Sequence, residues 1–95
     1  MSLNVSSGVQ RKITARHGVS VEEVEQCFAN RGGNFLKDSR EQHKSVPPAM
    51  WFVAETDYGR KLKIVFIQEV DESITLKTAY EANTEELRIY EKFGA

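Results

Sequence analysis

The feature that most constrains this chain is a short turn, Tyr58-Gly59, between two segments of strand-forming residues. Residues 50–56 and 61–68 are rich in aromatic, β-branched and other apolar side chains. The apolar side chains of the second segment alternate and so share one face: Leu62, Ile64 and Phe66. A tight turn containing glycine between two such segments is typical of a β-hairpin. We therefore expect an antiparallel pair of strands with one apolar face.

Further strands are expected on both sides of this hairpin. Residues 70–73 predict a turn into a third strand over residues 74–80. Alternation in that strand places four side chains on one side: Ile74, Leu76, Thr78 and Tyr80. Residues 34–39 predict a weak, short strand, and residues 40–48 a polar loop, the segment expected to be most mobile. The sheet is therefore predicted to be an antiparallel meander of three or four strands.

Two helices are predicted before the sheet. The first should begin after Ser6 or Ser7, whose hydroxyls can accept hydrogen bonds from free amides, and end at Gly18. The second covers about residues 21–30 and opens with Ser20-x-x-Glu23, a capping box that satisfies two free amides at the helix start. The glycines that follow it are expected to end this helix.

One more helix is predicted after the sheet, capped by Asn83, with Glu86 at its third position, and ended by Gly94. The order of elements predicts an α+β fold in a single domain over residues 1–95, with the helices on one face of the sheet. The side chains expected between helices and sheet are Leu62, Ile64, Phe66, Val24, Phe28, Leu76 and Leu87.

Charge excludes a uniformly basic nucleic-acid binder, because 13 Lys and Arg stand against 14 Asp and Glu in 95 residues. The charges are nevertheless segregated. Residues 1–19 contain three cations and no acid, whereas residues 20–30 contain three acids and no base. Such a two-signed surface can offer a basic face to phosphates and an acidic face to a basic partner, or it can be an ordinary mixed surface.

Cys27 cannot form an internal disulfide or a thiolate-rich metal cluster, because it is the one cysteine of the chain. Its neighbours Val24 and Phe28 favour a buried structural thiol over a nucleophile. The longest apolar run, residues 62–67, is too short to cross a membrane, and the first residues lack an apolar signal core. We expect a cytoplasmic protein with no membrane span, no metal site and no cofactor.

Short motifs follow one another in a recognisable order. They are Arg16-His17-Gly18-Val19-Ser20 before an acidic helix, Tyr58-Gly59-Arg60 with Leu62 and Val65, Ile74 and Leu76 with Thr78-Ala79, and Asn83 with Glu86 and Tyr90. Together, over about residues 11–93, they resemble the BrnT family of small bacterial toxins. That family belongs to the RelE-like ribonucleases, whose compact domains cleave RNA without a metal and are silenced by an antitoxin.

The resemblance implies RNA as substrate, an antitoxin protein as partner and no cofactor. A homodimer is kept as an alternative assembly. It implies site residues at Arg60, Glu86 and Tyr90, and substrate binding by Arg16 and His17. We add two residues to this predicted site: Tyr80 as a catalytic candidate and Lys61, next to Arg60, as a substrate-binding candidate.

Metal-free RNA cleavage needs a base for the 2′-hydroxyl, a cation for the phosphorane-like transition state and an acid for the leaving oxygen. Arg60 could be the cation. Glu86 and Tyr90 lie four residues apart on one helical face, and Tyr80 leads into that helix, so the three can form an acid–base cluster.

Each of these residues also has a structural interpretation. Glu86 can be explained as a helix cap without any catalytic role. Tyr90 can likewise be an amphipathic packing contact, and Arg60 a charge at a strand end. His17 can bond the last carbonyls of its helix. Trp51 is typical of a core residue rather than a base-stacking platform.

Many BrnT-like chains carry Arg after the small-Ala pair that ends the third strand, whereas this chain has Tyr80 followed by Glu81. The sequence therefore predicts a metal-independent endoribonuclease toxin of a toxin–antitoxin pair, or a degenerate relative of one. The alternative is a noncatalytic protein-interaction or regulatory domain of the same fold, including one whose acidic helices dock a partner.

Overall fold

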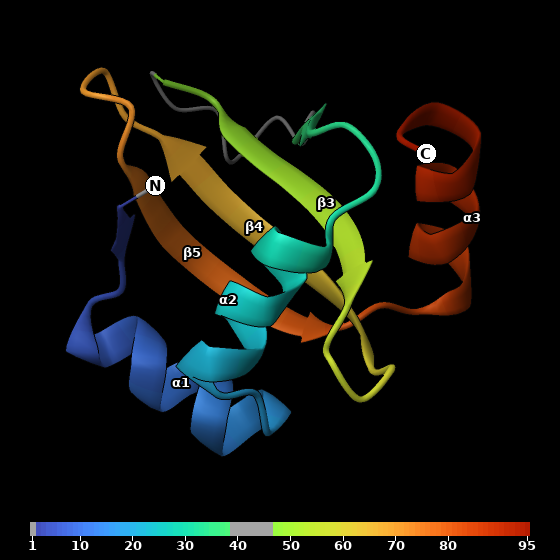
Figure 1. Ribbon diagram of the computed structural model, residues 1–95. Coiled ribbons are helices and arrows are strands. Elements are labelled where there is room, and N and C mark those ends of the chain that lie inside the picture. Colours follow the sequence, from blue (N-terminus) through green and yellow to red (C-terminus); the bar gives the residue numbers. More distant parts are fainter. Residues whose placement is uncertain (1, 39–46) are drawn as a thin grey trace.

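The protein is an α+β domain in which helices pack against a five-stranded sheet (Figure 1). The structure is a computed structural model that describes residues 2–38 and 47–95. Its elements are β1 (Leu3–Asn4), α1 (Ser7–His17), α2 (Val21–Asn30), β2 (Leu36–Lys37), β3 (Ala49–Glu55), β4 (Lys61–Gln68), β5 (Ile74–Glu81) and α3 (Thr84–Phe93).

The sheet has the strand order β1-β5-β4-β3-β2 and is mixed. The expected hairpin and third strand are confirmed as the antiparallel run β3, β4 and β5. The expected number of strands is wrong, because β1 adds a parallel edge strand in which Leu3 pairs with Ile74. Two residues leave no alternation to detect in a sequence. The weak strand predicted over residues 34–39 is reduced to β2, and most of the predicted polar loop lies outside the described residues.

The helix starts follow from their capping residues. Ser6 accepts a hydrogen bond from the Val9 amide and begins α1, and Gly18 ends it in the left-handed conformation at φ 61°. Both predicted capping boxes are present, Ser20 with Glu23 on α2 and Asn83 with Glu86 on α3. The second helix ends at Asn30, two residues before the glycines expected to end it. Local hydrogen-bond chemistry therefore sets these boundaries.

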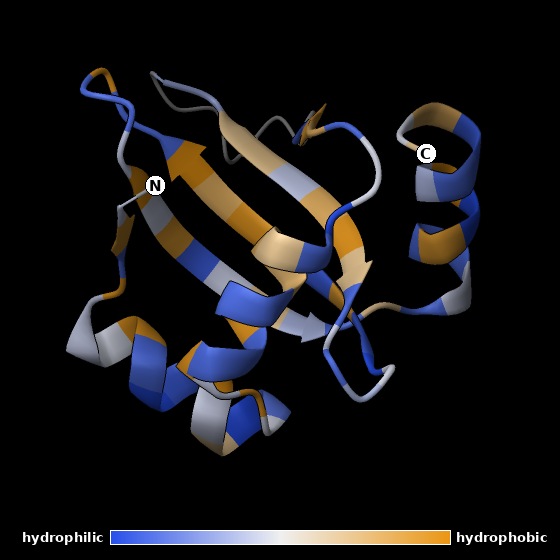
Figure 2. Ribbon diagram, in the orientation of Figure 1, coloured by the Kyte–Doolittle hydropathy of each residue, from blue (hydrophilic) through white to orange (hydrophobic). Residues whose placement is uncertain are grey.

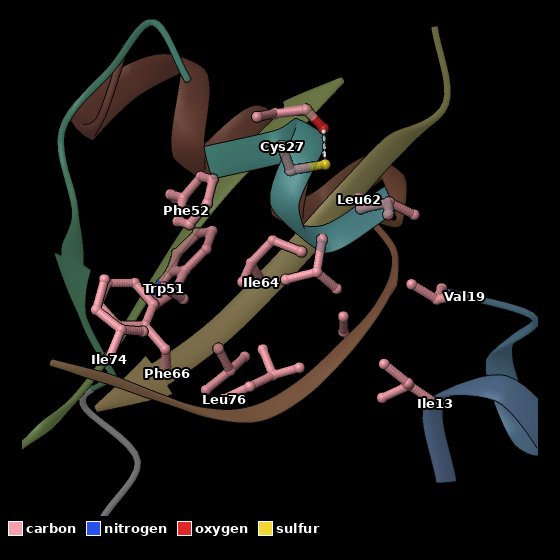
Figure 3. Packing of buried hydrophobic residues seen from close by; sticks show 14 of the residues in the cluster. Ile13, Val19, Cys27, Trp51, Phe52, Leu62, Ile64, Phe66, Ile74 and Leu76 are labelled. Atoms are coloured by element: carbon pink, nitrogen blue, oxygen red, sulfur yellow. Dashed lines mark hydrogen bonds between the residues drawn. The ribbon is translucent and has the colours of Figure 1, made fainter. Parts of the chain in front are cut away.

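The core lies between one face of the sheet and the helices α1 and α2, and hydrophobic residues are concentrated along β3 and β4 (Figure 2). Leu62, Ile64 and Phe66 are fully buried there, as predicted from their alternation (Figure 3). Four aromatic rings meet edge to face in this layer: Phe28, Phe35, Phe52 and Phe66. Edge-to-face contacts stabilise such clusters beyond the burial of their area.

A β-bulge in β5 changes which side chains face the core. Val65 pairs with Thr78, but its neighbour Phe66 pairs with Leu76, so Lys77 has no partner across the ladder. The inserted residue shifts the alternation by one position. Ala79 is consequently buried on the face that α1 and α2 cover, and Thr78 and Tyr80 lie on the opposite face. The prediction that Thr78 and Tyr80 share a side with Ile74 and Leu76 is therefore wrong.

The third helix packs on that opposite face, against β3. Its Tyr90 ring lies 5.8 Å from the Trp51 ring, and Trp51 points away from the face on which Phe52 meets α2. Ile89 also packs against the core cluster, whereas Leu87 is only half-buried and does not belong to it. Helices therefore cover both faces of the sheet. The predictions that all helices lie on one face and that Leu87 faces the same layer as Leu62 are wrong.

Cys27 is a buried thiol, as its apolar neighbours predict. Its exposed fraction is 0%, and its thiol lies 3.5 Å from the Ala54 carbonyl oxygen, to which it donates (Figure 3). Burial, as the main cause, and the Glu23 carboxylate, as a further one, together raise the pKa of the Cys27 thiol to about 12. A thiol of this kind stays protonated near neutral pH, so it is not a nucleophile.

Candidate functional site

Three polar side chains form a connected cluster on the sheet face that α3 covers. Lys63 Nζ donates to Glu86 Oε2 at 2.9 Å, and Tyr80 Oη donates to the same oxygen at 3.1 Å. The other carboxylate oxygen of Glu86 accepts the Asn83 amide at 3.0 Å as part of the capping box. One carboxylate thus joins two neighbouring strands to the first turn of α3.

Backbone geometry places each member of this polar cluster. Lys63 and Tyr80 are directly paired residues on β4 and β5, and Tyr80 faces α3 because of the bulge at Lys77. Glu86 is held by the capping box that begins α3. Directly paired side chains on one face lie close enough to share a ligand.

Electrostatics assign a protonation state to two of these groups, Glu86 and Tyr80. Burial raises the pKa of Glu86, but hydrogen bonds from Asn83 and Lys63, with the Lys63 charge, outweigh it and lower that pKa overall. Burial is the main reason that the pKa of Tyr80 is raised. At neutral pH Glu86 is therefore a carboxylate and Tyr80 a protonated phenol, both in contact with Lys63.

Two members of the polar cluster, Lys63 and Glu86, line a groove of about 400 Å³ between α3 and the sheet. Its lining residues are Leu36, Lys37, Asp38, Trp51, Lys63, Glu86, Ile89 and Phe93. We call this hollow the α3 groove. The Lys63 ammonium lies 4.6 Å from the centroid of the Trp51 ring, so a cation–π contact helps to fix its position. The groove therefore combines apolar walls with two lysines, Lys37 and Lys63, and two acidic residues, Asp38 and Glu86.

Arg60 lies outside the polar cluster, although the resemblance implies that it binds phosphate. Its guanidinium donates to the carbonyls of His17 at 3.0 Å and Gly18 at 2.7 Å. It also forms an ion pair with Glu23 at 3.2 Å and lies 3.5 Å from Glu81. Arg60 therefore ties the start of β4 to the connection between α1 and α2.

Tyr90 likewise points away from the polar cluster. Its hydroxyl donates to the Asn34 carbonyl at 2.7 Å, and its ring packs on Trp51. With 6% of its surface exposed, Tyr90 is part of the core. Of the four predicted catalytic candidates, the structure brings together Tyr80 and Glu86 and leaves Arg60 and Tyr90 in separate contacts.

The three predicted substrate-binding residues differ in their burial and in their position relative to the polar cluster. His17 is half-buried, with its ring centroid 5.5 Å from that of Tyr80, so the end of α1 reaches the polar cluster. Lys61 is exposed two residues before Lys63 on β4, hence on the same strand face. Arg16 is exposed at the end of α1.

Lys63 is the member of the polar cluster that sequence reasoning missed. The available signal was a charge inside the apolar run of residues 62–67. Such a run predicts a strand that is covered on both faces, and a lysine at a covered position needs an anionic partner. Lys63 is 12% exposed and finds that partner in Glu86.

Comparisons with known proteins do not add a family assignment: no protein-family model matches the chain, and no curated protein matches it. Within residues 2–38 and 47–95, no helix is long and apolar enough to cross a membrane. The same residues contain no group of three or more His, Cys, Asp or Glu side chains placed to hold a metal ion.

Proposed function

We propose that this protein is a metal-independent endoribonuclease related to the BrnT toxins, with Lys63, Tyr80 and Glu86 as its reacting groups. The observation that carries the proposal is that one oxygen of Glu86 contacts both the Lys63 ammonium and the Tyr80 hydroxyl beside the α3 groove. These groups supply a cation, an acid and a base, which are the three roles that metal-free RNA cleavage needs.

The proposed reaction is attack of a ribose 2′-oxygen on the adjacent phosphorus. Glu86 takes the 2′-hydroxyl proton, the new O–P bond forms, and the bond to the 5′-oxygen breaks. Tyr80 gives its proton to that leaving oxygen, so the products are a 2′,3′-cyclic phosphate and a 5′-hydroxyl. Lys63 stabilises the extra negative charge of the transition state. The hydrogen bond between Tyr80 and Glu86 then returns the proton to Tyr80 and resets the site.

The experiment is cleavage of single-stranded RNA by purified protein in excess chelator. Lys63→Gln should lower the rate on the order of a hundredfold, a typical loss for one electrostatic contact with a transition state. Lys92→Gln is the matched control, because Lys92 is an exposed lysine outside the α3 groove, and its rate should equal that of the wild type.

Two further variants separate chemistry from folding. Tyr80→Phe removes only a hydroxyl, and Glu86→Gln keeps most of the cap geometry while removing the carboxylate. Both should lose cleavage, with changes in thermal melting too small to account for the loss. Wild-type protein that leaves RNA intact in chelator would contradict the proposal.

A second candidate function is a noncatalytic interaction or regulatory domain of the same fold. It is favoured by Arg60, whose guanidinium is occupied by protein groups, and by the acidic Glu81 that follows Tyr80. This candidate predicts folded wild-type protein without cleavage and without slowed growth on induced expression. In either case we propose the cytoplasm as the place of action, where the RNA lies and Cys27 stays reduced.

A further inference from the structure

The basic helix α1 stands out from the rest of a nearly neutral molecule. Arg11, Lys12 and Arg16 are all exposed, and α1 contains no acidic residue. None of the three forms an ion pair with another residue in the described parts of the chain. The remaining exposed positions of α1 carry small or neutral polar side chains, and its visible ribbon is largely hydrophilic (Figure 2).

The neighbouring helix carries the opposite charge. Glu22 and Glu25 are exposed on α2, which contains no base and follows α1 after a three-residue connection. A polyanion attracted to α1 is therefore repelled from α2. This charge asymmetry restricts an anionic partner to the α1 side of the pair.

The helix α1 packs on one face of the sheet and the polar cluster lies on the other. The C-terminal end of α1 is nevertheless next to the polar cluster. The His17 ring contacts Tyr80, whose hydroxyl bonds Glu86. An 11-residue helix is about 16 Å long. All three cations of α1 thus lie within about that distance of the residue that touches the polar cluster.

We propose that the exposed cations of α1 bind the sugar-phosphate backbone of single-stranded RNA and hold the strand beside the Lys63–Tyr80–Glu86 cluster. The proposal deepens the proposed function, on which it rests for the choice of RNA. Phosphate is the matching ligand because a run of unpaired cations displaces condensed counterions from a polyanion. Binding can nevertheless be measured without cleavage.

The test uses a fluorescent 2′-O-methyl RNA of about 12 nucleotides, which covers a typical single-strand site and has no free 2′-hydroxyl to react. With three phosphate contacts, the logarithm of the binding constant should fall with the logarithm of salt concentration with a slope of about −2. That slope corresponds to roughly twentyfold weaker binding for a fourfold rise in salt.

Two matched double variants locate the binding. Lys12→Gln with Arg16→Gln removes two charges four residues apart on α1, and should reduce the slope to about −0.7. Arg88→Gln with Lys92→Gln removes two charges at the same spacing on α3, and should leave affinity and slope as in the wild type. Glutamine preserves helix propensity, and thermal melting checks that both proteins fold.

Three results would overturn the proposal. They are no binding by the wild type at low salt, equal losses in the two double variants, and equally tight binding of an acidic peptide of the same charge. The outcome is also separable from that of the proposed function. RNA that is cut equally well by the α1 variant refutes only the α1 proposal, whereas α1-dependent binding without cleavage of ordinary RNA refutes only the ribonuclease.

Discussion

Lys63 and Tyr80 face each other across β4 and β5 and donate to the same oxygen of Glu86, at 2.9 and 3.1 Å. This pair fastens the first turn of α3 to the sheet. The contact works only while Glu86 is ionised, because a protonated carboxyl accepts hydrogen bonds poorly and carries no charge for Lys63. The same property makes the attachment of α3 sensitive to acid.

The first prediction concerns that sensitivity. The pKa of Glu86 is lowered below its ordinary value of 4.5. The pKa of Glu23 is also lowered, mainly because its carboxylate accepts a hydrogen bond from the Ser20 backbone amide. A lowered folded-state pKa stabilises the protein above the unfolded pKa, and that contribution is lost as pH falls through the folded value. The free energy of unfolding, measured with urea, should therefore be highest near neutral pH. It should decrease as the pH is lowered below about 4.5.

Removing the titrating groups checks the assignment. Glu86→Gln and Glu23→Gln should each lower stability at neutral pH, by about 1 kcal/mol, and flatten the decline in acid. Exposed Glu91→Gln should leave the pH profile unchanged. If the free energy of unfolding falls in acid as steeply in both glutamine variants as in the wild type, other carboxylates cause the fall.

The second prediction concerns Arg60 as a structural tie. Arg60→Ala removes hydrogen bonds to two carbonyls and an ion pair with Glu23, and should cost about 1–3 kcal/mol in urea unfolding. Arg88→Ala is the control, since Arg88 pairs with Glu85 on an exposed helix surface, where such a pair contributes only about 0.5 kcal/mol. If both variants unfold alike, the contacts of Arg60 contribute no more to stability than an exposed ion pair.

The fold was predictable from sequence wherever it depends on neighbours along the chain. Ser20 with Glu23, and Asn83 with Glu86, begin helices because their side chains reach amides three residues away. The face shared by Leu62 and Phe66 follows from regular alternation. Such local patterns need no knowledge of distant partners.

What could not be predicted depends on long-range pairing. The bulge at Lys77 is an outcome of how β5 fits β4, and it decides that Tyr80 faces α3. The direction of Arg60 depends on the carbonyls of the connection between α1 and α2, more than 40 residues earlier in the chain. Half of the predicted catalytic set, Tyr80 and Glu86, came together, because both flank the same strand-to-helix connection.

The third prediction concerns the thiol. Cys27 is fully buried and its pKa is raised to about 12, so iodoacetamide should label the native protein far more slowly than free cysteine at neutral pH. Labelling should become fast in denaturant. Rapid labelling of the folded protein would show that α2 opens readily from β3.

The fourth prediction compares Leu62 and Leu87, two leucines that the sequence predicts to lie in the same buried layer. Leu62→Ala should cost about 2–5 kcal/mol, because Leu62 is fully buried between β4 and the helices. Leu87→Ala should cost about 1 kcal/mol or less, because Leu87 is half-buried and outside the core cluster. Equal losses in chemical denaturation would place α3 against the core more tightly than the structure has it.

The last prediction tests the bulge. Deleting Lys77 removes the inserted residue of β5, so Leu76 and Thr78 become neighbours and can pair in regular register with Phe66 and Val65. Ordinary alternation then keeps Ala79 in the layer under α1 and α2, and it keeps Tyr80 on the α3 face with its hydrogen bond to Glu86. We expect the deletion variant to fold, with an unfolding free energy within about 1 kcal/mol of the wild type. Lys77→Ala keeps the bulge and removes only an exposed side chain, so its stability should stay within about 0.5 kcal/mol of the wild type. A loss of more than about 3 kcal/mol in the deletion variant would mean that Leu76 and Thr78 do not keep Phe66 and Val65 as partners once the inserted residue is removed.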